Sequence, residues 1–170
     1  MITVGILTVS DRASLGTRDD LSGPAIREVL TQSLAEDVEV TRYQIVPDER
    51  VIIEATLREW VDEMDMDLIL TTGGTGLSPR DVTPEATRAV LQREVPGLVE
   101  AIRAASLVKT PHAMLSRAVA GVRRQSLIVN LPGSPRAVRE ALEVILPAVP
   151  HAVDLIHGRG GDDHELKRKG

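Results

Sequence analysis

Hydrophobic residues occupy nearly every position of residues 2–9, and most of them are β-branched. A stretch that is apolar on both faces is typical of a central strand with helices on each side of its sheet. Further stretches rich in apolar residues predict strands at residues 38–46, 68–72, 118–122 and 127–131.

Between these stretches the apolar residues recur every three or four positions, which predicts amphipathic helices. We expect helices to begin near residues 23, 49, 83 and 135, and another after a Pro-Gly pair at 96–97 that interrupts the third. Asp48 and Ser134 stand at N-cap positions. Pro147 and Pro150 predict a bent last helix or two nearly continuous ones.

Strands that alternate with helices predict a three-layer α/β/α sandwich with a mostly parallel sheet. We expect one domain over residues 1–157, because 170 residues are too few for two ordinary domains. Residues 158–170 are polar and predict a frayed tail.

The composition narrows the class of protein. The formal net charge of −5 disfavours a general nucleic-acid binder, which needs an excess of Lys and Arg. Hydrophobic residues make up 42% of the chain, but no apolar run approaches the roughly 20 residues that a membrane-spanning helix needs. Residues 1–9 lack a basic leader and a cleavage site, so a cytoplasmic location is the default expectation. The chain has no cysteine, which excludes disulfides, thiolate metal sites and a cysteine nucleophile.

The residues with chemical potential lie directly after the predicted strands, where the loops of an open α/β sheet converge on one crevice. We expect four loops to meet there, at residues 10–12, 47–49, 72–81 and 130–134. Together they supply glycines, carboxylates, hydroxyls and arginines at one end of the sheet.

Gly73, Gly74 and Gly76 permit a tight turn whose N–H groups form an anion-binding nest, although a plain glycine-rich turn remains an alternative. The chain has neither the G-x-G-x-x-G dinucleotide pattern nor the G-x-x-x-x-G-K-[ST] phosphate loop. A conventional NAD enzyme and a P-loop NTPase are therefore disfavoured.

Asp48 and Asp81 are either structural loop acids or a pair that positions Mg²⁺, which prefers one or two carboxylates together with phosphate oxygens. Ser134 is an N-cap that also suits phosphate binding, since a helix start attracts anions. Ser116 and Arg117 offer a hydroxyl and a guanidinium, although a surface role is more frequent for such a pair. The four histidines show no metal-ligand spacing.

Six motifs in order resemble the molybdopterin adenylyltransferases, which include bacterial Mog-type enzymes and the G domains of proteins such as gephyrin. They are Thr8-Val-Ser-Asp-Arg, Val46-Pro-Asp-Glu, Leu70-Thr-Thr-Gly-Gly-Thr-Gly, Pro79-Arg-Asp-Val-Thr-Pro-Glu-Ala-Thr, Met114-Leu-Ser-Arg and Ile128-Val-Asn-Leu-Pro-Gly-Ser. The resemblance runs from residue 2 to about 157. The B-type proteins share most of these motifs, so the subgroup stays open.

The resemblance implies a homotrimer with ATP and molybdopterin as substrates, Mg²⁺ as cofactor and a molybdate-insertion protein as downstream partner. It makes Asp48 and Asp81 the catalytic residues and tentative Mg²⁺ ligands. Residues 18–22 stand where members of the family vary, so nothing is carried over there. The implied substrate-binding residues are Ser10, Asp11, Gly73, Gly74, Thr75, Gly76, Arg80, Ser116, Arg117, Pro132, Gly133 and Ser134.

In the implied reaction, the phosphate of molybdopterin attacks the α-phosphorus of ATP, and pyrophosphate leaves. Two rival hypotheses remain. One is a non-catalytic molybdopterin-binding or scaffold protein of the B-type, and the other is a nucleotide hydrolase on the same fold.

Overall fold

The computed structural model describes residues 1–160 and contains in that range a six-stranded sheet in the order β2-β1-β3-β6-β5-β4. The first four strands of this order run parallel to one another. At the other edge β5 pairs antiparallel with β6, and β4 pairs antiparallel with β5. The strands are β1 (Ile2–Val9), β2 (Val38–Val46), β3 (Leu68–Thr72), β4 (Arg93–Glu94), β5 (Ala120–Arg123) and β6 (Ser126–Leu131).

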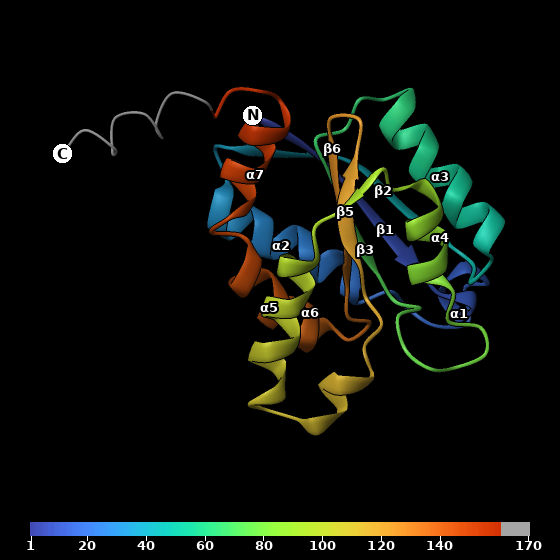
Figure 1. Cartoon of the computed structure of the whole chain (residues 1–170). Coiled ribbons are helices and arrows are strands. Elements are labelled where there is room, and N and C mark those ends of the chain that lie inside the picture. The colour runs from blue at the N-terminus through green and yellow to red at the C-terminus, as the bar shows by residue number, and fades with distance from the viewer. Residues whose placement is uncertain (161–170) are drawn as a thin grey trace.

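Helices cover both faces of the sheet, which confirms the three-layer α/β/α prediction (Figure 1). One face carries α2 (Ser22–Leu34), α5 (Pro96–Leu107), α6 (Pro135–Ile145) and α7 (Val149–Ile156). The other carries α3 (Arg50–Asp62) and α4 (Thr83–Val90). Two short helices, α1 (Asp11–Ser14) and the 3-10 turn η1 (Pro111–Leu115), lie in the connections.

Successive side chains of the central strands enter opposite cores. Leu68 and Leu70 of β3 pack in the core beneath α2 and α6, whereas Ile69 packs against α3 and α4. All three side chains are fully buried. This two-residue alternation between two apolar layers explains why the sequence shows an unbroken hydrophobic run.

Several predicted boundaries needed correction. The strand expected at 118–122 begins only at Ala120, because the N–H of Val119 donates to the side chain of Asn130, 3.1 Å away. The helix that starts near residue 83 ends at Val90, well before Pro96. The strand β4 lies between the end of α4 and the start of α5. It was not predicted, because two residues are too few to show an alternation of apolar and polar positions. The last helical region is two helices, one of the two expected forms.

None of the helices in the described residues is long and apolar enough to cross a membrane. The predicted tail begins at residue 158, and its residues 161–170 lie outside the described range. The division into a domain of residues 1–157 and a tail therefore stays a prediction.

Candidate active site

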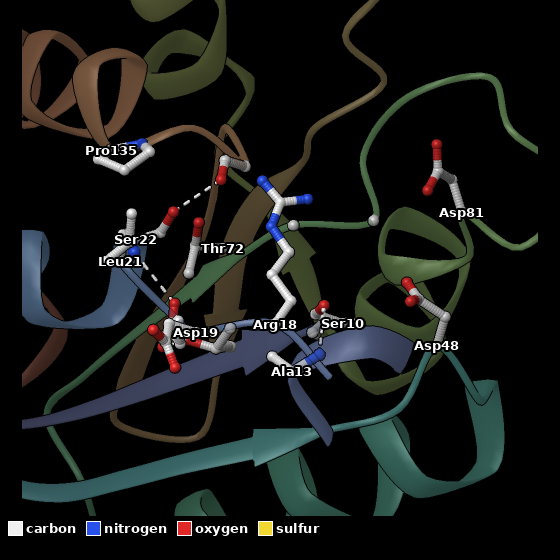
Figure 2. Close-up of a pocket in the computed structure, with 16 residues that line it drawn as sticks. Ser10, Ala13, Arg18, Asp19, Leu21, Ser22, Asp48, Thr72, Asp81 and Pro135 are labelled. Atoms are coloured by element: carbon white, nitrogen blue, oxygen red, sulfur yellow. Dashed lines mark hydrogen bonds between the residues drawn. The ribbon is translucent and has the colours of Figure 1, made fainter. Parts of the chain in front are cut away.

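All four predicted loops contribute to the lining of one pocket of about 260 Å³ at the carboxyl ends of the parallel strands (Figure 2). The pocket brings together six residues that the sequence analysis selected, namely Ser10, Asp48, Gly73, Gly74, Asp81 and Gly133. These come from the ends of β1, β2, β3 and β6, which lie side by side in the sheet. The chemistry-bearing side chains therefore share a single hollow.

The glycine turn after β3 forms the floor of this pocket. Gly73 and Gly74 have φ angles of 93° and 68°, which residues with a Cβ atom rarely adopt. A Cβ atom on Gly73 would overlap the carbonyl oxygen of Val9, so the turn lies directly on the end of β1. Thr83 holds the turn, because its hydroxyl donates to the carbonyl of Gly73 at 2.9 Å.

Within residues 1–160, no acceptor is found for the N–H groups of Gly74 and Thr75. Gly133 also contacts the turn, because a Cβ atom placed on it would lie 3.5 Å from the Cα of Gly73. The floor is therefore made of main-chain atoms, as an anion nest requires.

Asp48 joins the first two loops. Its carboxylate accepts from the N–H of Asp11 at 2.9 Å, and its own N–H donates to the carboxylate of Asp11 at 3.0 Å. The expectation that Asp48 caps the next helix is wrong, because the N-cap position is Glu49 and no side chain caps that helix. Burial, together with repulsion from Asp11 and Asp81, raises the pKa of Asp48.

Asp81 faces Asp48 across the edge of the pocket (Figure 2). Its carboxylate accepts from the N–H of Ser78 at 3.0 Å, which fixes the loop between the glycine turn and α4. Two carboxylates that repel each other in one pocket fit Mg²⁺, because a divalent cation would cancel that repulsion. Among the described residues no group of three or more His, Cys, Asp or Glu could hold a metal. The donor set therefore suits a cation that shares its ligands with substrate phosphates.

Arg80 lies outside the pocket lining. Its guanidinium donates twice to Asp11 at 3.0 Å and once to Glu49 at 2.9 Å. This contact lowers the pKa of Asp11 and raises that of Arg80. Arg80 thus fastens the loop after β3 onto the loops after β1 and β2.

Arg117 is similarly engaged by the protein. Its guanidinium donates to the carbonyls of Gly76 at 2.7 Å and Asp81 at 2.8 Å, and it forms an ion pair with Glu85. Arg117 therefore supports the backbone on either side of residues 77–80. Direct contact of Arg80 or Arg117 with a substrate stays a prediction.

The remaining selected residues lie around the pocket rather than in its lining. Ser134 caps α6, as predicted, by accepting from the N–H of Ala137 at 3.2 Å. Ser116 and Pro132 line a second, more apolar pocket of about 230 Å³ between α5, η1 and α6. The residues that line neither pocket are Asp11, Thr75, Gly76, Arg80, Arg117 and Ser134.

Sequence reasoning missed the wall formed by residues 18–22, which line the pocket between α1 and α2. Asp20 anchors this wall. It accepts from the hydroxyl of Thr8 at 2.7 Å, from the N–H of Ser22 at 3.0 Å and from the hydroxyl of Tyr43. Burial opposes ionisation, but these bonds outweigh it and lower the pKa of Asp20, while burial and Asp20 raise the pKa of Tyr43 to about 12.

A signal for this wall was present in the sequence. An aspartate placed two and three residues before helical N–H groups is an N-terminal cap pattern, and Asp20 also binds the N–H of Gly23 at 3.1 Å. Ser22 extends the wall to the loop after β6, because its hydroxyl donates to the carbonyl of Gly133 at 2.6 Å.

The chain belongs to the family described as "Probable molybdopterin binding domain", whose model matches residues 5–151. A molybdopterin adenylyltransferase of Helicobacter pylori strain J99 is 52% identical over 92% of this chain and 89% of its own length. The molybdopterin adenylyltransferase of Escherichia coli K12 is 48% identical over 92% of this chain and 79% of its own length.

Solved structures of molybdopterin biosynthesis proteins also resemble this chain. The crystal structure of the molybdopterin biosynthesis enzyme MoaB from Thermus thermophilus is 57% identical, with a TM-score of 0.87 over 93% of this chain and 98% of that one. The Mog protein of Mycobacterium ulcerans is 45% identical, with a TM-score of 0.83 over 92% of this chain and 99% of that one.

Proposed function

We propose that this chain is a nucleotidyltransferase that adenylates molybdopterin. A phosphate oxygen of molybdopterin forms a bond to the α-phosphorus of ATP, and the bond from that phosphorus to the bridging oxygen breaks. The products are adenylyl-molybdopterin and pyrophosphate. The observation that carries the proposal is the single pocket in which the Gly73 turn, Asp48 and Asp81 meet. The names of the similar proteins support the same reaction.

The pocket's residues suit a reaction between two polyanions. A phosphate monoester has a second pKa near ~6 and is largely dianionic at neutral pH, so its attack needs no general base. No histidine lines the pocket in the part of the chain that the structure describes. The residues therefore act by neutralising charge and aligning the two phosphates, which is the main source of catalysis in phosphoryl and nucleotidyl transfer.

Asp48 and Asp81 would hold Mg²⁺, and the main-chain N–H groups of Gly74 and Thr75 would donate hydrogen bonds to phosphate oxygens. The ion would supply charge neutralisation on the phosphates when bound. Asp11 and Arg80 position Asp48, while Arg117 positions Asp81 through its backbone carbonyl.

Three further assignments follow from the resemblance and complete the proposal. We propose a homotrimer, a molybdate-insertion protein as the downstream partner and a cytoplasmic location. Size-exclusion chromatography with light scattering tests the first, because a trimer has about three times the 18.4 kDa mass of the chain.

The direct test is to incubate the protein with molybdopterin and Mg-ATP and to measure adenylated pterin and pyrophosphate together. We expect both products in equal amounts, and neither when molybdopterin is omitted. AMP that forms without molybdopterin would identify a nucleotide hydrolase instead.

A non-catalytic molybdopterin-binding protein is the second candidate. The observation that favours it is the strong similarity to a structure named MoaB, since B-type proteins share this fold and most of the motifs. Binding of ATP and molybdopterin without any pyrophosphate would select this function over the transferase.

A further inference from the structure

We infer that Arg18 binds a phosphate group of one of the two substrates. This inference rests on the proposed function, and it assigns a substrate contact to the wall of residues 18–22. Arg18 lines the pocket, and Figure 2 shows its side chain extending from the wall into the hollow.

The wall that carries Arg18 is fixed in place. Four groups donate to the carboxylate of Asp20, two of them main-chain N–H groups at the start of α2. The hydroxyl of Ser22 then ties the same wall to Gly133 in the loop after β6. Arg18 therefore projects from an anchored segment, which reduces the loss of conformational entropy when it binds a ligand.

The negative charge of the pocket lining favours a cationic residue that can bind a phosphate. Four of its lining residues are aspartates, at positions 19, 20, 48 and 81, and Arg18 is the one lysine or arginine among the lining residues in the described range. A polyanionic substrate would be repelled by this set of carboxylates. Mg²⁺ can offset the repulsion near Asp48 and Asp81, whereas Arg18 is the cation available on the opposite wall.

The other arginines of the site are already engaged. Arg80 is bound to two carboxylates, and Arg117 to two carbonyls and a carboxylate. Within residues 1–160 no hydrogen-bond or ion-pair partner is found for the guanidinium of Arg18. A guanidinium offers a planar fork that matches two oxygens of one phosphate, so its open donors in the pocket that the Gly73 turn also lines indicate an oxyanion ligand.

The test compares Arg18→Gln and Arg18→Lys with the wild-type protein, and Arg42→Gln serves as the matched control. Arg42 is an exposed arginine on β2 that does not line the pocket, and its substitution makes the same change in net charge. The measurements are the KM of each substrate, the turnover number, and the Kd of Mg-ATP and of AMP by calorimetry.

We expect Arg18→Gln to raise the KM of one substrate by about 10- to 100-fold, the usual effect of losing a charge-assisted hydrogen bond. Arg18→Lys should recover part of this loss, because it restores the charge without the fork. A weaker Kd for Mg-ATP with little change for AMP places Arg18 on the β- or γ-phosphate. An effect on the KM of molybdopterin alone places it on the pterin phosphate.

Unchanged KM and Kd values for both substrates in Arg18→Gln would overturn the inference while the transferase function stands. An equal loss in Arg42→Gln would also overturn it, because the effect would then come from net charge. Failure of the wild-type protein to bind either substrate would remove the proposed function and this inference together. The melting temperature of Arg18→Gln should match that of the wild type, since the side chain has no partner to lose among residues 1–160.

Discussion

A methyl group added at Gly73 would overlap the carbonyl oxygen of Val9, so we expect Gly73→Ala to destabilise the protein and to lower its activity. The overlapping atom belongs to the main chain of β1 and cannot rotate away. The φ angle of 93° adds a second cost, because a residue with a Cβ atom rarely adopts it.

Gly16→Ala separates these two costs. Gly16 has a φ angle of 74°, but a Cβ atom on it would have no neighbour within 4 Å. The left-handed conformation costs about 1–2 kcal/mol, and the reduced entropy of the unfolded chain returns about 0.4–1 kcal/mol in both variants. Overpacking adds about 1–3 kcal/mol in Gly73→Ala alone. We therefore expect losses of about 1 kcal/mol for Gly16→Ala and about 3 kcal/mol for Gly73→Ala.

Urea denaturation of the two variants measures the difference, provided that the slope of the unfolding free energy stays unchanged. The adenylation assay should show normal activity in Gly16→Ala and at least a ~10-fold loss in Gly73→Ala, because relief of the overlap moves the phosphate-binding turn. Equal losses of stability in the two variants would refute the close contact between the turn and β1.

Three further substitutions test the carboxylates and their support. Asp81→Asn should lower turnover at least ~100-fold with an unchanged melting temperature, the effect of losing one electrostatic element of a preorganised site, and near-normal pyrophosphate release would remove Asp81 from the mechanism. Asp48→Asn should match or exceed the wild-type stability at pH 7. Because the pKa of Asp48 is raised in the folded protein, ionisation of its carboxylate lowers the free energy of unfolding. The wild type therefore loses stability as the pH rises through that pKa. The advantage of Asn should vanish below about pH 4, where Asp48 is protonated in both states, and an Asn variant that is less stable at pH 7 would contradict this account. Arg117→Met should lower the unfolding free energy by about 1–3 kcal/mol, because the carbonyl of Gly76 and the carboxylate of Glu85 lose their partner, and urea denaturation with no such loss would show that the contacts are weak.

The layered fold could be predicted from the sequence because its parallel strands are buried on both faces. Ile69 and its neighbours give an unbroken apolar run that only a two-sided core explains. The antiparallel edge was harder to predict. β4 has two exposed residues and takes its place from its pairing with Val122 and Gly121, which no local pattern encodes.

The candidate site could be predicted where local sequence determines backbone shape. Glycines at 73 and 74 do adopt the left-handed conformations that the turn requires. The roles of two arginines could not be predicted from the sequence. A guanidinium near a phosphate loop suits a ligand and a carboxylate equally well, and only the fold shows that Arg80 and Arg117 have protein partners. Arg18 could not be separated from an ordinary surface residue, because Asp20 anchors its segment through Thr8 and Tyr43, which are distant in sequence.

The contact between Gly73 and Gly133 restricts how this architecture can diversify during evolution. Neither residue carries a side chain, and one added at Gly73 would overlap the carbonyl oxygen of Val9, so substitution of Gly73 alters the shape of the base. A descendant that retains the same base can acquire a different ligand preference only by exchanging residues along its rim. The segment from Arg18 to Leu21 is suited to such exchange, because Asp20 secures it and leaves the adjacent side chains free to change.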